Sequence, residues 1–188
     1  SDVYKRQALF NYRDPRWRIE HAQVLSEGDI ELFNQKIIPS VQPTHATSDM
    51  YWLNERIGPI RAKYAYAYKE LLDKSQIIAF GTDFPVEDIS PIMTFYSAVA
   101  RKDINGYPDE GFQIENSISR GDALIAMTRY GAYANFEEDE KGSIEVGKFA
   151  DFIILDNDLI TSAENRIPLT NIVATFINGE LVFNRRFN

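Results

Sequence analysis

The sequence predicts an α/β protein in which parallel strands alternate with helices, followed by a small β-rich unit. Strand-like and helix-like segments alternate from residue 17 to residue 134, an order typical of parallel strands with right-handed crossovers, as in a β/α barrel or a doubly wound sheet. From Gly142 onward, residues alternate with period two and are rich in Ile, Val and Phe. Since a closed barrel needs eight strands and about 250 residues, three strands imply either an open sheet or a partial barrel.

The amino-acid composition excludes several classes of function. The chain has 188 residues, with 28 acidic against 20 basic side chains and a formal net charge of −8, which argues against a nucleic-acid-binding surface. With 44% hydrophobic and 26% charged residues it should form a packed core, and it contains no long apolar run that predicts a transmembrane helix. Because Cys is absent, any metal must be held by His, Asp or Glu, and the 2 His cannot supply a three-His zinc site by themselves.

The first predicted elements are a strand, a helix and a second strand. Residues 17–20 are a short β-prone run. Residues 26–29 have the form of a capping box, and Ile30 and Phe33 follow at helical spacing. Residues 37–41 read as the second strand.

A loop, a helix and a buried strand are predicted next. The loop covers residues 43–59, which are rich in aromatic and polar side chains, and the helix covers residues 61–74. The apolar run at residues 76–80, stopped by Gly81, is typical of a strand buried on both faces of a parallel sheet.

Two further helices follow. Ser90 and Pro91 form a helix start, and a polar loop is predicted at residues 103–111. Ser119 opens the second helix, whose apolar stripe is predicted to contain Leu124, Met127 and Ala134.

The chain is expected to divide near residue 136, ahead of the acidic run at residues 137–140. Residues 1–7 fit no neighbouring pattern and are interpreted as a non-native scar, which suggests a fragment whose natural N-terminus lies upstream. The predicted domains are residues 8–135, a partial β/α unit, and residues 136–188. In the second, strands are expected at residues 143–146, 151–155 and 173–183, with a turn at Asn178-Gly179.

Candidate chemical groups follow the three predicted strands. His21 comes after the first, His45 lies just past the second, and Asp83 comes after the third. In β/α barrels such positions lie at one mouth, where His and carboxylate ligands could form a wall of a zinc-type hydrolytic site. Each has a simpler explanation: a hydrogen-bonded structural histidine, a solvated loop side chain and a turn residue, respectively. Tyr51 and Trp52 could likewise merely cover the mouth.

Four motifs, in order, resemble the amidohydrolase superfamily, most closely its branch of N-substituted formamide deformylase and D-aminoacylase-like enzymes. They are Arg18–Gln23, Ser40–His45, Phe80–Val86 and Lys141–Phe152, and the resemblance spans about residues 16 to 183. It implies the C-terminal part, about three β/α units equivalent to strands six to eight, of a TIM-type metal-dependent hydrolase barrel. Part of a small β-sandwich domain would follow.

The resemblance also implies roles for single residues. His21 matches the metal-binding His of the sixth strand, and Asp83 matches the Asp of the eighth, which binds metal and acts as catalytic general base and acid. His45 matches a substrate-binding pocket residue. By position, Tyr51 and Trp52 are expected to receive an apolar part of the substrate. The remaining metal ligands of the family, an H-x-H pair, a bridging Lys or carboxylate and a fifth-strand His, would lie upstream.

The implied activity is hydrolysis of non-peptide C–N bonds, of the amide type, in a small molecule. The implied cofactor is a divalent metal, with one or two Zn²⁺ ions expected, because a metal lowers the pKa of bound water toward neutrality. The expected partner is the small-molecule substrate, with no nucleic acid and no membrane; a homo-oligomer is compatible with this interpretation, and the expected location is the cytoplasm.

Two competing hypotheses remain at the level of sequence. The scaffold could persist without chemistry, as a binding or structural protein. Alternatively, the chain could be an open α/β domain unrelated to amidohydrolases, in which case the side chains of His21 and Asp83 should lie more than about 10 Å apart, too far to share one metal cluster.

Overall fold

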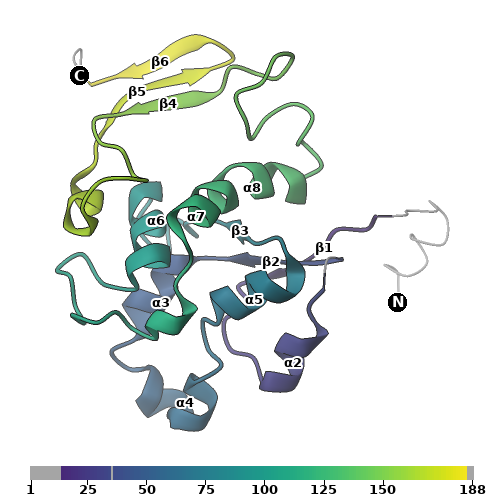
Figure 1. The fold of residues 1–188 in the computed structure, drawn as a ribbon, viewed down its shortest axis with the longest axis vertical. Helices are drawn as coiled ribbons and strands as arrows, with labels where there is room; N and C mark the ends of the chain where they lie inside the picture. Colours follow the sequence, from purple (N-terminus) through teal and green to yellow (C-terminus); the bar gives the residue numbers. More distant parts are fainter. Residues whose placement is uncertain (1–13, 35, 186–188) are drawn as a thin grey trace.

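The computed structural model describes residues 14–34 and 36–185. It contains two three-stranded sheets, one parallel and one antiparallel (Figure 1). The parallel sheet consists of β1 (Trp17–Glu20), β2 (Ile37–Val41) and β3 (Ala79–Phe80), and the antiparallel sheet of β4 (Phe152–Leu155), β5 (Ile172–Ile177) and β6 (Glu180–Asn184). The α-helices are α2 (Glu27–Leu32), α3 (Pro43–Asp49), α4 (Leu53–Ala62), α5 (Tyr68–Ser75), α6 (Pro91–Ala100), α7 (Arg120–Met127) and α8 (Arg129–Ala134). Two 3₁₀ helices are η1 (Ile114–Asn116) and η2 (Glu164–Leu169). No helix in the described part of the chain is long and apolar enough to cross a membrane.

The first sheet has the parallel order β1-β2-β3, as the alternation of strands and helices predicts. Glu20 pairs with Ser40, and Val41 pairs with Phe80, so the three strands end at the same edge. The third strand is shorter than the predicted run of residues 76–80, because its ladder with β2 covers two residues. The residues that follow these strands are therefore brought together.

The core lies mainly between β2 and the helices α3, α5, α6 and α7. Val41, Leu71 and Phe95 are fully buried within it. The other face of β2 is covered too, because Ile38 packs with Ala79 and Ala134. A central parallel strand buried on both faces is the environment that its apolar sequence predicts.

The predicted capping box of α2 is confirmed. Ser26 Oγ accepts a hydrogen bond from the backbone N–H of Asp29, and the Asp29 carboxylate accepts one from the backbone N–H of Ser26. The aspartate thus performs the task usually given to glutamate at this position.

The prediction of a loop at residues 43–59 is wrong, because the segment forms α3 and most of α4. Pro43 begins α3 at a position where its missing N–H costs nothing. Burial of residues 43–47 against α6, with Thr47 and Ser97 hydroxyls 3.0 Å apart, stabilises a helix that local propensity alone does not favour. The helix α4 is interrupted at Gly58, where φ is 76°.

The predicted helix at residues 61–74 is also divided. Its front part belongs to the end of α4, and α5 begins only at Tyr68. Between them Ala65 forms a β-bridge with Val24, and the Tyr66 N–H donates to the Gln23 carbonyl at 2.9 Å. These tertiary hydrogen bonds replace the helical ones.

The helix α6 is confirmed, and residues 103–111 contain no helix or strand, as expected. The single helix predicted from Ser119 onward is instead two helices, which meet at Thr128 with φ −124° and ψ −83°. Of the predicted stripe, Ala134 is buried and Met127 packs against the core, but Leu124 is 40% exposed, and Ala123 and Ala126 are buried beside it instead. Small residues therefore make the close contact of α7 with the core.

In the second sheet the predicted hairpin is confirmed, with Asn178 and Gly179 at φ 50° and 79° between β5 and β6. The strand expected at residues 143–146 does not form. Its Ile144 and Val146 are exposed, and Lys148 folds back to donate to the Ser143 hydroxyl at 2.7 Å. Period-two alternation in this segment reflects a turn between two glycines rather than a pleated strand.

The acidic run after α8 is tied to the start of the first sheet. Arg16 pairs with Glu138 at 2.5 Å and with Asp14 at 2.9 Å, while its guanidinium lies 3.6 Å from the centre of the Tyr133 ring. At least one member of the run is therefore anchored. The division of the chain near residue 136 stays a prediction, and the expected scar at residues 1–7 lies outside the described residues.

Candidate metal centre

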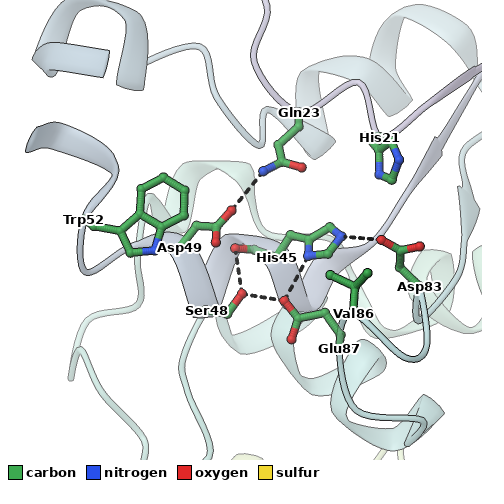
Figure 2. A pocket seen from close by; sticks show the side chains of 9 residues that line it. All are labelled: His21, Gln23, His45, Ser48, Asp49, Trp52, Asp83, Val86 and Glu87. Carbon is green, nitrogen blue, oxygen red and sulfur yellow. Dashed lines mark hydrogen bonds and ion pairs between the residues drawn. The ribbon is translucent and has the colours of Figure 1, made fainter. Parts of the chain in front are cut away.

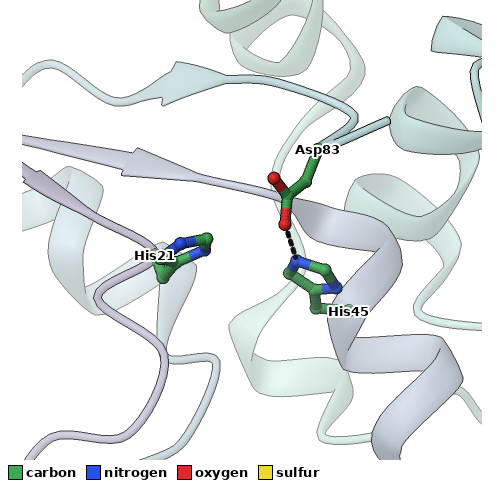
Figure 3. Close-up of side chains that lie close together, drawn as sticks. All are labelled: His21, His45 and Asp83. Carbon is green, nitrogen blue, oxygen red and sulfur yellow. Dashed lines mark hydrogen bonds and ion pairs between the residues drawn. The ribbon is translucent and has the colours of Figure 1, made fainter. Parts of the chain in front are cut away.

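Three potential metal ligands converge where the parallel strands end. His21 directly follows β1, His45 lies on α3 just past β2, and Asp83 follows β3 (Figure 3). One nitrogen or oxygen atom from each side chain lies within 4.8 Å of those from the other two. This distance excludes the arrangement in which His21 and Asp83 are more than 10 Å apart.

His21 is held by both its backbone and its ring. Its N–H donates to the carbonyl of Ser40 at 2.7 Å, and its φ is 66°, in the left-handed region that non-glycine residues rarely adopt. The ring atom Nδ1 lies 2.9 Å from Oε1 of Gln42, which is an acceptor. A proton on Nδ1 leaves the lone pair of Nε2 free for a metal.

Gln42 can orient the His21 ring because the backbone of Gln42 is itself held in place. It precedes α3 but makes no side-chain cap to that helix, and its backbone carbonyl accepts a hydrogen bond from the buried Tyr68 hydroxyl at 3.1 Å. Its side chain is thereby free to bond His21.

Asp83 also has a left-handed backbone, with φ 59°. The chain reaches it from Gly81, whose N–H continues the ladder to the Val41 carbonyl at 3.0 Å, and leaves it through a turn in which the Val86 N–H donates to the Asp83 carbonyl at 2.7 Å. Both potential ligands at strand ends therefore occupy unfavourable backbone conformations, as is common at functional sites.

His45 lies between two carboxylates and is itself buried. Its Nε2 is 3.2 Å from Asp83 Oδ2, and its Nδ1 is 2.9 Å from Glu87 Oε1 (Figure 2). The same Glu87 oxygen accepts a hydrogen bond from the Ser48 hydroxyl at 2.5 Å. Because carboxylates only accept, a ring nitrogen of His45 that carries a proton donates to the carboxylate that it faces.

These side chains face a cavity of about 590 Å³. Its lining consists of His21, Gln23, His45, Ser48, Asp49, Trp52, Asp83, Val86 and Glu87. The volume suits a small organic molecule rather than a polymer.

Away from the three potential ligands, the cavity contains another carboxylate that is held by hydrogen bonds. Asp49 Oδ2 accepts hydrogen bonds from Gln23 Nε2 at 2.8 Å and from the Tyr66 hydroxyl at 2.5 Å. Burial, with the neighbouring Asp49, raises the pKa of Tyr66, so its hydroxyl stays protonated and donates.

The two aromatic residues predicted to bind substrate are placed differently. Trp52 lines the cavity, but Tyr51 does not. The Tyr51 hydroxyl donates to Asp103 at 2.5 Å, its ring stacks on Tyr107 with centroids 5.9 Å apart, and the hydrogen bond raises its pKa. Contact between Tyr51 and a substrate stays a prediction that the cavity does not support.

Several functional candidates were not predicted from the sequence: Gln23, Gln42, Ser48, Asp49 and Glu87. Two of them had a usable signal once α3 is known to be a helix, since Ser48 and Asp49 lie three and four residues after His45 and so share its face. Glu87 and Gln23 come from loops, where no periodicity marks the direction of a side chain.

The chemistry of the potential ligand set fits a divalent metal. Neutral imidazole and carboxylate are ordinary ligands of zinc and related ions, and they need no thiolate. The Gln42 contact gives His21 the tautomer that a metal requires, and Asp83 supplies an anionic oxygen within the same small volume.

Comparison with known proteins agrees with this geometry. Residues 3–183 match the model of the family described as "Amidohydrolase family". The chain is 36% identical over 185 residues to Protein LONG AFTER FAR-RED 3 of Arabidopsis thaliana, covering 97% of this chain and 31% of that protein. It is 31% identical over 169 residues to the putative amidohydrolase YtcJ of Bacillus subtilis, covering 89% and 32%.

A more distant relative is N-substituted formamide deformylase of Arthrobacter pascens, 28% identical over 120 residues, covering 64% of this chain and 22% of that protein. Among solved structures, an uncharacterized metal-dependent hydrolase from Pyrococcus horikoshii superposes with a TM-score of 0.66 at 32% identity, covering 78% of this chain and 30% of that one. The chain spans about a third of the length of the Arabidopsis and Bacillus relatives that it matches.

Proposed function

Because the chain belongs to the amidohydrolase family, we propose that it carries part of the active site of a metal-dependent hydrolase that cleaves non-peptide C–N bonds in small molecules. The observation that carries the proposal is the convergence of His21, His45 and Asp83 within 4.8 Å on one cavity. The deformylase relative supports C–N chemistry, because its name specifies a formamide substrate.

In this proposal β1, β2 and β3 correspond to strands six to eight of a TIM-type barrel, and β4 to β6 belong to a small β-sandwich domain. Their parallel pairing and the position of the cavity at their carboxyl ends support the barrel, since active sites of such barrels lie at that face. Further ligands would come from strands outside this chain.

His21 and Asp83 would hold the metal, for which Zn²⁺ is the proposed ion. When bound, a divalent ion supplies a Lewis acid that polarises the scissile group and makes water more acidic. Gln42 keeps the His21 lone pair directed to the site, and β1 and β3 fix the separation of the two ligands.

Asp83 would also move the proton. It accepts a proton from the attacking water as the new C–O bond forms, and it donates that proton to the nitrogen as the C–N bond breaks. His45 restrains the Asp83 carboxylate through the 3.2 Å contact and presents its N–H to the same space, where a substrate oxygen would gain negative charge. Trp52 would contact the remainder of the substrate.

A second role for His45 is that of a third ligand. Its Nε2 lies close enough to the other two groups, and a metal-binding His commonly bonds a carboxylate through its other nitrogen, as His45 does with Glu87. Zinc affinity separates the roles: His45→Gln should leave it nearly unchanged if His45 faces substrate, and should lower it as strongly as His21→Gln does if His45 is a ligand.

The proposal is tested by Asp83→Asn in the whole protein loaded with zinc. We expect kcat for small N-substituted amides to fall by about a thousandfold, because the general base is lost, and bound zinc, measured by mass spectrometry, to decrease. Asp109→Asn, an exposed carboxylate outside the cavity, is the matched control and should change neither quantity.

Unchanged turnover in Asp83→Asn would remove Asp83 from the mechanism. If the wild-type protein binds zinc without hydrolysing any amide in a broad panel, the C–N specificity fails. If it neither binds metal nor hydrolyses amides, the scaffold persists without chemistry and the hydrolase proposal is wrong.

A further inference from the structure

The side chains that line the cavity carry more negative than positive charge. None of the nine lining residues is Lys or Arg, while three are the carboxylates Asp49, Asp83 and Glu87. Asp83 and Glu87 share His45 between them, at 3.2 and 2.9 Å. Asp49 lies apart from this arrangement.

The partners of Asp49 are neutral. Gln23 and the Tyr66 hydroxyl both donate to Oδ2, and no described Lys, Arg or His side chain forms an ion pair with the carboxylate. Among the described residues, Oδ1 accepts no hydrogen bond from a side chain. The carboxylate is thus oriented by two donors but keeps an uncompensated charge and a free oxygen.

An aromatic ring accompanies this carboxylate. Trp52 follows Asp49 by one turn, and the backbone N–H of Trp52 donates to the backbone carbonyl of Asp49 at 3.1 Å. Both side chains line the cavity (Figure 2). Arg56 lies 6.0 Å from the Trp52 ring centre but does not line the cavity. An indole ring and the free Oδ1 of Asp49 together favour a cation, through cation–π contact and a charge-assisted hydrogen bond.

We propose that the Asp49–Trp52 end of the cavity is a specificity site for a cationic group of the substrate, of the guanidinium or ammonium class. This inference rests on the proposed function, since it places the cationic group in the cavity whose opposite end carries His21 and Asp83. The substrate would span the cavity, with its scissile bond at the potential ligands and its positive charge against Asp49.

The test compares two ligands of nearly equal shape, benzylguanidinium and benzylurea, in binding to the whole zinc-loaded protein by isothermal titration calorimetry. The first is a cation at neutral pH and the second is neutral, and neither needs to be hydrolysed. We expect wild type to bind benzylguanidinium about tenfold more tightly, as one partly exposed charge pair predicts, and this preference to shrink as salt is raised.

Asp49→Asn should abolish the preference while keeping the shape and hydrogen bonding of the side chain. Glu55→Gln is the matched control, because Glu55 is an exposed carboxylate three residues after Trp52 that does not line the cavity, and it should keep the wild-type preference. Equal binding of the two ligands by wild type, or a preference that survives in Asp49→Asn, would overturn the proposal.

If Asp49→Asn does not fold, the salt dependence of the wild-type preference decides the matter, because a preference that persists undiminished at high salt does not come from a charge pair. Failure of the hydrolase proposal is recognised separately. Absence of amide hydrolysis would leave the binding result intact, whereas rapid hydrolysis of neutral amides without any preference for cations would reject the specificity site alone.

Discussion

Single residues around His45 determine how rigidly Asp83 is held. Glu87 bonds the far nitrogen of His45, and Ser48 bonds the same oxygen of Glu87, so a line of hydrogen bonds runs from the surface of α3 to the potential metal ligand. Whether His45 faces substrate or binds metal, Glu87 acts by positioning its ring.

Glu87→Ala should therefore lower kcat by about ten- to a hundredfold, the usual effect of removing a carboxylate that orients a histidine of a metal site. Glu87→Gln keeps the acceptor oxygen and should recover part of the loss, and Ser48→Ala should have a smaller effect because it removes one contact to Glu87. Steady-state kinetics and zinc titration of the three variants check this ordering. A Glu87→Ala protein with wild-type kcat and zinc affinity would show that Glu87 is only structural.

At the scale of elements, the glycine that leads from α8 toward the second sheet is under a specific constraint. Gly142 has φ 89°, and a Cβ added there would lie 2.8 Å from Cβ of Ala132 and 3.2 Å from the Thr128 carbonyl oxygen. Gly147 has a similar φ of 97° but has no atom within 4 Å of an added Cβ.

Gly142→Ala should thus destabilise the protein by about 3 kcal/mol, combining backbone strain with overpacking against α8. Gly147→Ala should cost about 1 kcal/mol, from backbone strain alone. Urea denaturation of the two variants measures the difference. Equal losses of unfolding free energy in the two variants would mean that α8 moves aside for the added methyl group at no energetic cost.

The elements also show what the sequence could and could not predict. The first two strands, the capping box and the hairpin were predicted correctly, because each is fixed by neighbouring residues. The helix α3 was missed, because it depends on burial against α6, which is distant in sequence. Missing α3 in turn hid Asp49, whereas His21, His45 and Asp83 were singled out from their positions after strands and from the family resemblance of the motifs around them.

At the scale of the whole molecule, Arg16 joins the beginning of the first sheet to the segment after α8. Its hydrogen bond lowers the pKa of Glu138, and likewise that of Asp14. A carboxyl group whose pKa is lowered by folding stabilises the native state above its ordinary pKa, and this contribution is lost as the pH falls through the lowered value.

Glu138→Gln should consequently reduce the free energy of unfolding by about 1 kcal/mol at neutral pH, a modest value because the carboxylate is partly exposed, and should flatten the loss of stability in acid. Asp139→Asn is the control from the same run, since the side chain of Asp139 makes no ion pair with the residues that the structure describes. Thermal unfolding between neutral and acidic pH tests this. A Glu138→Gln protein that loses stability in acid as steeply as wild type would contradict it.

The left-handed backbone at both His21 and Asp83 bears on the evolution of such proteins. Asn or Gly would adopt these conformations with less strain, so a lineage released from selection for catalysis would become more stable by replacing the two residues to which the proposed mechanism assigns metal binding and proton transfer. Inactive descendants should thus accumulate Asn or Gly at these two positions first, and retention of His and Asp there would be a sign of continued selection for chemistry.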